Sequence, residues 1–535
     1  MLRKSHSYQD LVSKFDWDIP RSYNIAHDIC DKWACDNDKV ALHYESPCGE
    51  TTTFTFKRIR QLSNQLSNVL TQFGVTKGDR VAVLLPQRPE VPIAHLASYR
   101  IGAIAVPLFT LFGRDALIYR LNDSGASTII TDDFGAELIA GIREELPHLS
   151  TVICADGATA GAHDFNGLLS QASDSFESLT LSSEDPAMII YTSGTTGDPK
   201  GALLPHRTML GHMPGVEFSH DFLGQPRDLI WSPADWAWIG GLVDVLFAAW
   251  QVGVPVVAKR FSKFEPDLAA DLMLKHSIRN VFMPPTALKM MRMLSRKELS
   301  KCDLRSIASG GESLGDELQG WAGDTFGVSI NEFYGQTECN MTVSGCSALY
   351  KPKIGAIGRA AAGHNVSVID SEGNEKPFGE KGMIAVKQPN PVTFLCYWNN
   401  EQATREKFLG SWLITGDTGY MDDEGFITFV GRDDDVITSA GYRIGPGPIE
   451  DCLISHPHVQ LAAVIGKADA DRSQVVKAFI VLREGVPAND LLKSDLKEWV
   501  KARLSRHEYP REIEFVSDLP KTNTGKIIRR LLRDR

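Results

Sequence analysis

A run of glycine and hydroxyl residues with a single lysine is the part of this sequence best suited to chemistry. It spans residues 191–201, reads YTSGTTGDPKG, and follows the apolar run at 187–190. Glycine lets the backbone approach a ligand closely, so the N–H groups and hydroxyls of such a loop can surround phosphates, and Lys200 can neutralise them. The loop lacks the Gly-Lys-Ser/Thr of a Walker A motif, and a plain surface loop is the alternative. The predicted phosphate-binding residues are Thr192, Ser193, Gly194, Thr195, Thr196, Gly197 and Lys200.

Four further motifs follow this loop along the chain. They read FYGQTE at 333–338, TGD at 415–417, GRDDD at 431–435 and LPKTNTGK at 519–526. In this order and at these separations, the set resembles the adenylate-forming superfamily, which includes acyl-CoA synthetases, firefly-type luciferases and peptide-synthetase adenylation domains. The resemblance covers nearly the whole chain, and the C-terminal segments resemble medium-chain acyl-CoA synthetases most closely. It implies that a carboxylic acid and ATP form an acyl-adenylate and pyrophosphate, after which the thiol of CoA takes the acyl group.

The resemblance also implies roles for single residues of the nucleotide site. Glu338 is expected to ligate Mg²⁺, with Thr192 nearby, because Mg²⁺ prefers hard oxygen ligands. Thr337 would hydrogen-bond the α-phosphate, and Asp417 can accept two hydrogen bonds from the ribose. The remaining residues expected around ATP or AMP are Gly311, Glu312, Ser313, Tyr334, Gly335, Gln336 and Arg432.

The resemblance further implies that the C-terminal hundred residues contribute a movable set of groups. Lys526 would bridge the attacking carboxylate and the α-phosphate, Arg443 would approach the phosphates, and Asp433 would be the hinge of a rotating domain. Lys521 is the alternative lysine. The acidic run after the hinge favours a solvated connector, and Arg529, Arg530 and Arg533 are interpreted as ordinary solvated charges. The residues expected to contact CoA are Ser439, Gly441, Tyr442 and Arg472, while Pro448 and Ser473 depart from the related pattern nearby.

The acyl group is expected to lie against small and aromatic residues. Acetyl-CoA synthetases tend to carry tryptophan just before the Gln-Thr-Glu, whereas this chain has Gly335, which leaves room for a longer or branched acid. An extra methylene in an apolar pocket is worth only about 1–3 kcal/mol, so a range of chain lengths is expected. Ordinary packing in the core is the alternative for these side chains. The predicted pocket residues are Trp236, Trp238, Gly240, Phe282, Gly310 and Gly335.

Apolar runs that are typical of strands alternate with helical patterns in the first part of the chain. The runs lie at 80–85, 104–108 and 127–131, with helical stretches near 90–100 and 116–121. This alternation favours parallel sheets covered by helices. A second set repeats the rhythm at 229–231, 254–257, 280–283 and 306–309.

The last part of the chain has a different pattern. Short strands and turns between 383 and 430 suit a small β subdomain, and residues 464–504 indicate a small α+β domain. We therefore predict an α/β fold with a large N-terminal domain, residues 1–432, made of two sheet-bearing α/β lobes plus the β subdomain. A small mobile α+β C-terminal domain, residues 433–535, is expected to follow.

Composition limits the class of protein. The chain has 535 residues, 43% hydrophobic content and a net charge of −11, which disfavours nucleic acid as a partner. Nine cysteines without a CxxC pair argue against zinc ribbons and fit a reducing compartment. We see neither a signal peptide nor a membrane span and expect a cytoplasmic protein. Its expected partners are a small carboxylic acid and CoA, and a homodimer stays open.

Several functions remain compatible with the motifs. An acyl-CoA ligase for short- to medium-chain acids is the first, with ATP, Mg²⁺ and CoA as its cofactor and co-substrates. An adenylating enzyme that delivers the acyl group to a carrier-protein phosphopantetheine is the second, although no carrier module is visible in the chain. An acetyl- or propionyl-specific ligase, an aromatic-acid ligase, a non-catalytic nucleotide-binding protein and a luciferase-like oxidase are the others.

Overall fold

The computed structural model divides into two compact units, each described here by itself. It describes the chain apart from residues 1, 3, 4, 6, 160, 193–197, 262, 313, 433, 434, 436, 440, 441, 470–472, 505–508, 522–526, 534 and 535. Unit 1 comprises Met1–Ile354, Gly358–Asn365 and Gln388–Lys407, and unit 2 comprises Gly355–Ile357, Val366–Lys387 and Phe408–Arg535. This division does not test the predicted boundary between the N-terminal and C-terminal domains at residue 433, which stays a prediction.

The first sheet of unit 1 is mainly parallel, and its strand order is β19-β9-β8-β4-β3-β5-β6-β7 among the described residues. Its inner strands are continuous buried apolar runs, as parallel strands covered on both faces require. Leu84, Val106, Ile129 and Ile189 belong to one core cluster with helix residues Leu117 and Leu121. The strands are β3 (Arg80–Leu84), β4 (Ile104–Pro107), β5 (Thr128–Thr131), β6 (Thr151–Cys154), β7 (His163–Asp164), β8 (Pro186–Thr192), β9 (Lys200–Pro205) and β19 (Cys396–Tyr397).

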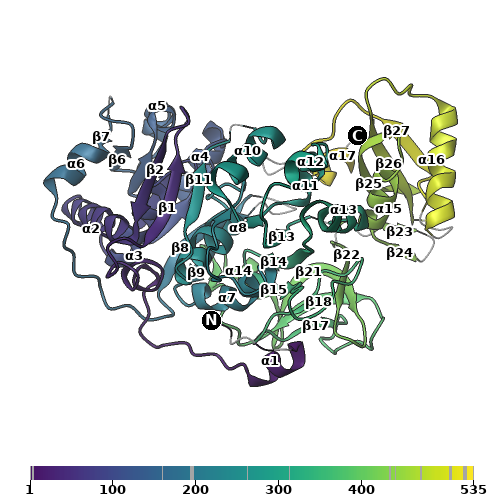
Figure 1. The fold of residues 1–535 in the computed structure, drawn as a ribbon, viewed down its shortest axis with the longest axis horizontal. Helices are drawn as coiled ribbons and strands as arrows, with labels where there is room; N and C mark the ends of the chain where they lie inside the picture. Colours follow the sequence, from purple (N-terminus) through teal and green to yellow (C-terminus); the bar gives the residue numbers. More distant parts are fainter. Residues whose placement is uncertain are drawn as a thin grey trace. The chain divides into compact units, whose positions relative to one another are not determined.

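The second sheet of unit 1 has the described order β16-β15-β14-β13-β12-β10-β11-β1-β2. Its first two strands come from the start of the chain, because β1 pairs in parallel with β11, with Leu42 opposite Val256. Figure 1 shows this purple hairpin beside β11. The strands are β1 (Val40–Glu45), β2 (Thr51–Thr55), β10 (Ile230–Trp231), β11 (Val256–Lys259), β12 (Asn280–Phe282), β13 (Ser306–Gly310), β14 (Ile330–Gln336), β15 (Cys339–Ser344) and β16 (Arg359–Ala360).

Helices cover both sheets of unit 1. The longest of those described, α2 (Phe56–Gln72), begins at Thr55, whose hydroxyl accepts a hydrogen bond from the Arg58 N–H at 3.2 Å, as a good N-cap does. The other helices of unit 1 are α1 (Tyr8–Lys14), η1 (His27–Asp31), α3 (Glu90–Ile101), α4 (Arg114–Ser124), α5 (Asp133–Ala140), η2 (Arg143–Glu145), α6 (Phe165–Gln171), α7 (Thr208–Ser219), α8 (Ile239–Gly241), η3 (Leu242–Phe247), α9 (Ala248–Gln251), α10 (Pro266–His276), α11 (Pro285–Met291), α12 (Arg296–Leu299), α13 (Asp316–Phe326) and α14 (Glu401–Glu406).

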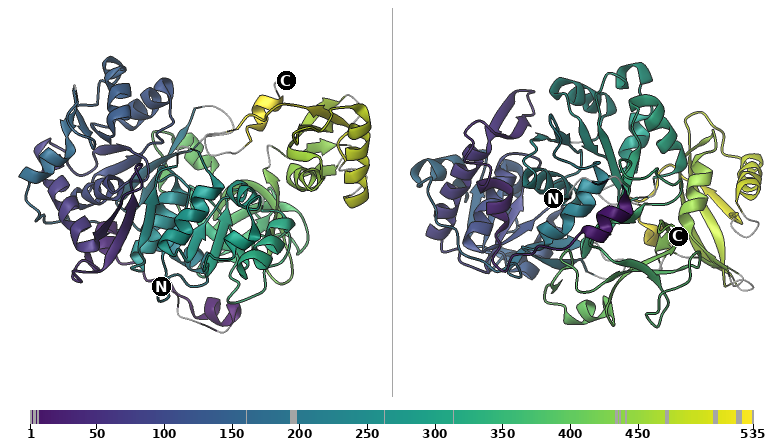
Figure 2. Two further views of the ribbon diagram at one scale, coloured as in Figure 1. Left: turned by 45° about the horizontal axis from the view of Figure 1, so that its top comes forward. Right: turned by 60° about the horizontal axis from the view of Figure 1, so that its bottom comes forward.

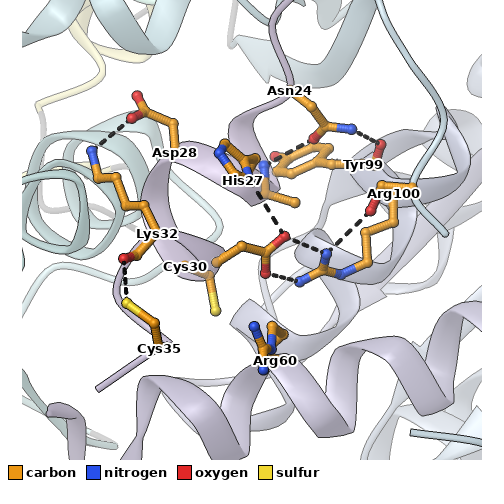
Figure 3. A network of polar contacts seen from close by, with 12 residues as sticks. Asn24, His27, Asp28, Cys30, Lys32, Cys35, Arg60, Tyr99 and Arg100 are labelled. Carbon is orange, nitrogen blue, oxygen red and sulfur yellow. Dashed lines mark hydrogen bonds and ion pairs between the residues drawn. The ribbon is translucent and has the colours of Figure 1, made fainter. Parts of the chain in front are cut away.

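A buried ion pair fixes the early segment of the chain to the first lobe. Arg100, at the end of α3 and only 2% exposed, donates to both carboxylate oxygens of Asp31 at 2.6 and 2.7 Å. Asn24 donates to the Tyr99 carbonyl at 2.9 Å, and Figure 3 shows this contact next to Arg100. Bidentate pairing of this kind is among the stronger polar contacts in proteins, so it holds η1 against α3.

Unit 2 contains two five-stranded sheets among its described residues. Asn489 caps α16 by accepting from the Leu492 N–H, which is why this helix begins at Asp490. Helix α16 lies along the sheet of β25 to β27 (Figures 1 and 2), where Leu492, Leu496 and Val500 join its core. The elements are β17 (Val366–Ile369), β18 (Gly382–Lys387), β20 (Phe408–Leu409), β21 (Trp412–Met421), β22 (Ile427–Arg432), β23 (Ile437–Ser439), β24 (Tyr442–Ile444), β25 (Val459–Asp469), β26 (Ser473–Leu482), β27 (Glu512–Phe515), α15 (Pro446–Ile454), α16 (Asp490–Arg503) and α17 (Arg529–Arg533).

The predicted α/β class is confirmed. The runs near 80, 104 and 128 are parallel neighbours in one sheet, and the second set, from 229 to 309, forms parallel neighbours in the other. Within the described part of the chain, no helix combines the length and the apolar content that crossing a bilayer requires.

Candidate active site

The phosphate-loop motif is the connection of an antiparallel hairpin. β8 ends at Thr192 and β9 begins at Lys200, and these two residues lie directly opposite each other. The Thr192 hydroxyl donates to the Lys200 carbonyl at 3.3 Å, and the Tyr119 hydroxyl donates to the Pro199 carbonyl at 3.0 Å. The ends of the loop are therefore fixed. The predicted residues Ser193, Gly194, Thr195, Thr196 and Gly197 lie outside the described residues.

The Gln-Thr-Glu motif forms the turn of the hairpin β14–β15. Glu338 is only 6% exposed, while Thr337 is half-buried. The strand register shifts between Tyr334 and Gln336, at Gly335. A Cβ on Gly335 would lie 2.4 Å from the Met341 backbone nitrogen, so this glycine is required by the close approach of the two strands. This packing requirement at Gly335 is independent of the predicted role of Gly335 in leaving room for a longer acyl chain, which stays a prediction.

Tyr397 connects the two motifs. Its hydroxyl donates to Glu338 Oε1, and its ring centroid lies 5.4 Å from Lys200 Nζ. It is 6% exposed and belongs to β19, where it pairs with Ala202 of β9. A carboxylate from one motif and an ammonium from the other thus contact one side chain, although the motifs lie far apart in the sequence.

The segment that carries Tyr397 contacts both sheets of unit 1. The Phe394 N–H donates to the Glu338 carbonyl at 3.0 Å, and Trp398 N–H donates to the Gly201 carbonyl at 2.7 Å. Further along, Lys407 Nζ donates to Gln336 Oε1 at 2.9 Å. We call residues 394–407 the strap, because backbone contacts join it to β9 on one side and to the Gln-Thr-Glu turn on the other.

Several residues predicted for the acyl pocket meet around a pair of aromatic rings. Phe333 lies 5.1 Å from Phe282, measured between ring centroids. A Cβ on Gly310 would lie 2.8 Å from the Phe333 ring, and one on Gly240 would lie 3.2 Å from Phe282 Cε1. The structure therefore brings together three of the six predicted pocket residues. Phe333 completes the cluster.

Three other predicted residues lie at or near this cluster. Gly311 adopts a left-handed φ of +86°, which glycine accepts at no steric cost, and Glu312 Oε2 accepts from the Thr286 hydroxyl at 2.7 Å. Tyr334, which follows Phe333, is half-buried. Ser313 lies outside the described residues.

The two predicted tryptophans differ in their surroundings. Trp236 is 1% exposed and is part of the core. Trp238 is half-buried and packs against Phe109 at 5.6 Å and Phe112 at 6.1 Å between ring centroids. Trp238 Nε1 is buried without a hydrogen-bond partner among the described residues. A buried indole N–H usually finds a partner, so Trp238 is the better of the two as a residue of a ligand pocket.

A buried polar cluster lies behind the Gln-Thr-Glu turn. Asp244, on η3, is 4% exposed and accepts from Asn340 Nδ2 at 2.7 Å. His212 Nε2 is 3.8 Å from Asp244 Oδ1, and the other ring nitrogen of His212 contacts the Thr208 carbonyl at 2.6 Å. Burial raises the pKa of Asp244 well above its usual value and lowers the pKa of His212 to about 4. Burial therefore favours the neutral form of both groups.

In unit 2, the residues predicted for the ribose are neighbours. Asp417 on β21 and Arg432 on β22 are opposite each other in the strand pairing. Asp417 is 4% exposed, Arg432 is exposed, and Arg432 Nε lies 3.8 Å from Asp417 Oδ1. The Asp417 N–H donates to the Thr415 hydroxyl at 3.1 Å, which helps to orient this part of β21. This arrangement can present one carboxylate and one guanidinium to a diol.

The predicted C-terminal residues are only partly described. Ser439 on β23 is buried and pairs with the backbone of Tyr442 on β24 and of Ser473 on β26. The backbone of Arg443 pairs with that of Thr438. Asp433, Gly441, Arg472 and Lys526 lie outside the described residues, so their predicted roles stay predictions. Lys521, the alternative lysine, has its Nζ 3.1 Å from Asp518 Oδ1.

Two interpretations of charged residues near the C-terminus were wrong. Asp435 is not part of a solvated connector, because it is 9% exposed and accepts from Arg529 at 3.3 Å and Arg533 at 2.5 Å. Arg529 also donates to both oxygens of Glu450, at 2.7 and 2.8 Å. Arg529 and Arg533 therefore attach α17 to the residues around Asp435 and α15, and only the exposed Arg530 fits the original interpretation.

The chemistry of the described donors fits Mg²⁺. Glu338 supplies a carboxylate and Thr192 a hydroxyl, and Mg²⁺ typically takes one or two carboxylates together with substrate phosphates. Within the described part of the chain, no group of three or more His, Cys, Asp or Glu residues is arranged to hold a metal without such a substrate. A metal that enters with a nucleotide suits this donor set better than a resident metal.

Comparisons with known proteins identify the family. The family model of AMP-binding enzymes matches residues 31–398, and that of the AMP-binding enzyme C-terminal domain matches residues 448–526. The chain therefore belongs to the family of AMP-binding enzymes. The predicted membership of the adenylate-forming superfamily is confirmed.

Relatives and solved structures cover almost the whole chain. The acetyl-coenzyme A synthetase of Bacillus subtilis is 35% identical over 98% of this chain and 94% of its own length. The mitochondrial acyl-coenzyme A synthetase ACSM4 of Rattus norvegicus is 34% identical over 98% and 92%. Among solved structures, the anthranilate CoA ligase AuaEII in complex with anthranoyl-AMP has 30% identity and a TM-score of 0.88 over 97% of this chain and 98% of its own.

Proposed function

We propose that this protein is an AMP-forming acyl-CoA synthetase for a short- to medium-chain carboxylic acid. The observation that carries the proposal is the convergence of Lys200 and Glu338 on Tyr397, because it unites a cation and a hard-oxygen ligand from two separate motifs. The relatives are acetyl- and acyl-coenzyme A synthetases, and they confirm the predicted enzyme class, an acid–thiol ligase.

In the first half-reaction an oxygen of the substrate carboxylate forms a bond to the α-phosphorus of ATP. The bond between the α-phosphorus and its bridging oxygen to the β-phosphate breaks, and pyrophosphate leaves. Both reactants are anions, so the protein must neutralise charge and align the attack. Lys200 and the loop from Thr192 would hold the β- and γ-phosphates, and Thr337 would donate to the α-phosphate. Mg²⁺, held by Glu338 and Thr192 together with the phosphates, would supply further positive charge.

In the second half-reaction the thiol of CoA attacks the acyl carbon, AMP leaves, and the thiol proton passes to solvent. Ser439, Gly441, Tyr442 and Arg472 are the proposed CoA contacts. Asp417 and Arg432 would hold the ribose of the nucleotide throughout, which their pairing across β21 and β22 supports. We also propose that residues 433–535 rotate about Asp433, so that Lys526 serves only the first half-reaction. This last step rests on the motif resemblance.

The acyl group would lie beside Phe333 and Phe282. Glycines at 240 and 310 let these two rings pack directly against the backbone, because a Cβ would lie 3.2 Å from Phe282 at the first position and 2.8 Å from Phe333 at the second. Acetate is the second candidate, since a relative of equal identity is an acetyl-coenzyme A synthetase. An aromatic acid is the third, since a similar structure is an anthranilate CoA ligase.

All nine cysteines, each within the described residues, are free, and this supports a reducing compartment, which we propose is the cytoplasm. A homodimer stays a prediction.

The test is product analysis with pure protein, ATP, Mg²⁺ and a panel of acids from acetate to decanoate, with benzoate added, in the presence or absence of CoA. We expect AMP, pyrophosphate and acyl-CoA in equal amounts, with the highest kcat/KM for an acid between butyrate and octanoate. Pyrophosphate release without any CoA thioester would favour the carrier-protein alternative. Formation of ADP, or no product with any acid, would contradict the proposal.

A further inference from the structure

The strap residue Tyr397 stands in an unusual position relative to the two charged motif residues. Its hydroxyl donates to Glu338 Oε1, while its ring face lies toward Lys200 Nζ, 5.4 Å from the centroid. A ring at this distance attracts an ammonium group through its quadrupole. One side chain therefore contacts the carboxylate and the ammonium by two different interactions, and neither contact depends on the other.

Tyr397 is itself held from three sides. Its strand pairs with β9, the strand that begins at Lys200, and its own N–H donates to the Thr404 hydroxyl at 2.9 Å. Its ring packs against Phe394 at 5.0 Å between centroids, and the Phe394 N–H donates to the Glu338 carbonyl. Since the side chain is 6% exposed, solvent does not compete strongly for its hydrogen bond.

The hydrogen bond to Oε1 has a consequence for the other carboxylate oxygen. It restricts rotation about the last side-chain torsion of Glu338, which is otherwise a soft, two-fold torsion. The direction of Oε2 is then fixed as well. Partners that orient a metal-binding carboxylate in this way typically account for about 10–100-fold in metal affinity or activity.

We propose that Tyr397 is a positioning residue, which orients Glu338 toward the metal of a metal–ATP complex and sets the distance between Glu338 and Lys200. The inference rests on the proposed function, because it takes Glu338 as the metal ligand. Tyr397 acts through Glu338 and takes no part in bond making. Its hydroxyl orients the carboxylate that would bind the metal, whereas its ring contacts the ammonium group of Lys200.

The test separates metal binding from catalysis. ATP binding is measured by calorimetry with Mn²⁺ present and again with EDTA, and Mn²⁺ binding is followed by electron paramagnetic resonance. Tyr397→Phe keeps the ring, its packing and the contact with Lys200, and removes only the hydroxyl. We expect the gain in ATP affinity that Mn²⁺ provides to fall by about tenfold in this variant, with ATP affinity in EDTA unchanged.

Tyr23→Phe is the matched control. Tyr23 is also a buried tyrosine of unit 1 whose hydroxyl donates to a carboxylate, Asp28, at 2.7 Å, and it lies outside every motif. We expect Tyr23→Phe to keep the full gain from Mn²⁺. Thermal melting of both variants reports the cost of losing a buried hydroxyl, which the two changes share.

Each outcome decides the proposal. An unchanged Mn²⁺ gain in Tyr397→Phe, with the gain lost in Glu338→Gln, would overturn the role of Tyr397 and leave that of Glu338. An unchanged gain in Glu338→Gln would overturn both roles. Equal losses in Tyr397→Phe and Tyr23→Phe would reduce the effect to general destabilisation and also overturn the proposal. Failure of the proposed function is a separate result, seen as absence of acid-dependent pyrophosphate release from the wild type.

Discussion

Residues of unit 1 and unit 2 that are expected to contact the nucleotide are held in different ways. In unit 1, Glu338 and Lys200 contact Tyr397, inside strands and a strap that pack closely. In unit 2, Arg432 is exposed and 3.8 Å from its partner Asp417, and α17 is attached by the ion pairs of Arg529 and Arg533. Close packing in the interior holds a side chain in one geometry. Ion pairs near the surface are weaker and are screened by salt. The comparison teaches that the described residues of the phosphate side are held by close packing, whereas those of unit 2 are held mainly by ion pairs.

The largest effect is expected from Lys526→Ala. Without this lysine, adenylation should slow by about 10³-fold, because a charge aimed at the developing transition state is lost. Thioester formation from preformed acyl-adenylate should change less than about threefold, since the lysine is then no longer required. Rapid-quench measurement of each half-reaction gives both numbers. Lys521→Ala is the control and should leave both rates near the wild type; equal losses in both half-reactions of Lys526→Ala would contradict the division of roles.

The second-largest effect is expected from removing the ion pairs that attach α17 in unit 2. Arg529→Ala leaves Asp435 and Glu450 without their shared partner, and we expect a loss of about 2 kcal/mol in the free energy of unfolding, since the pairs are only partly buried. Urea unfolding at low and high salt measures the loss, which should shrink as salt rises. The exposed neighbour in Arg530→Ala should cost less than about 0.5 kcal/mol. Similar losses in the two variants would remove the distinction between paired and solvated arginines.

The buried cluster of unit 1 gives a pH-dependent effect. The pKa of Asp244 is raised by burial, so the folded state binds a proton that the unfolded state has already released. The contribution of Asp244 to the free energy of unfolding is therefore fully present below about pH 4. It is lost as pH rises toward the pKa of the folded state, by up to about 1.4 kcal/mol per pH unit.

Asp244→Asn removes that titration and can still accept from Asn340. We expect this variant to gain stability relative to the wild type as pH rises from 5 to 7. Urea unfolding of both proteins at each pH measures the difference, and the opposing titration of buried histidines away from Asp244, such as His95, cancels between them. A difference that stays constant with pH would show that Asp244 is ionised in the folded protein.

The smallest effect is expected from Gly240→Ala, which tests how tightly unit 1 packs around the acyl group. The new Cβ would lie 3.2 Å from Phe282 Cε1 and would push this ring aside. We expect kcat/KM for the longest accepted acid to fall by about tenfold, with little change for acetate. Gly320→Ala on α13, where a Cβ meets nothing within 4 Å, is the control. Equal effects on long and short acids would place Gly240 away from the acyl group.

Much of the fold follows from local patterns. The strand runs near 80, 104 and 128 and the helix near 90–100 are continuous segments whose periodicity and flanking residues identify them. The pairing of β1 with β11 has no such signal, because it joins segments about two hundred residues apart. The same holds for Arg529, whose partners Asp435 and Glu450 are distant in sequence and looked like solvated charges.

The candidate site was predictable where a motif carries it. Thr192, Lys200, Glu338, Asp417 and Arg432 belong to motifs. Thr192, Lys200 and Arg432 lie at strand ends, Glu338 lies in a turn, and Asp417 lies within β21. Tyr397, Phe333 and Asp244 were missed. Tyr397 belongs to a short run of cysteine and aromatic residues that reads as core, and only the path of the strap across two sheets brings it to Glu338. Such contacts depend on tertiary packing, which the local sequence does not encode.

The central claim is that this chain joins a carboxylic acid to AMP before CoA takes part. Acid-dependent exchange of labelled pyrophosphate into ATP, measured without CoA, tests it most directly. We expect exchange with a medium-chain acid in the wild type and a rate at least about 100-fold lower in Glu338→Gln. Exchange that requires CoA, or that proceeds equally well without any acid, would contradict the claim.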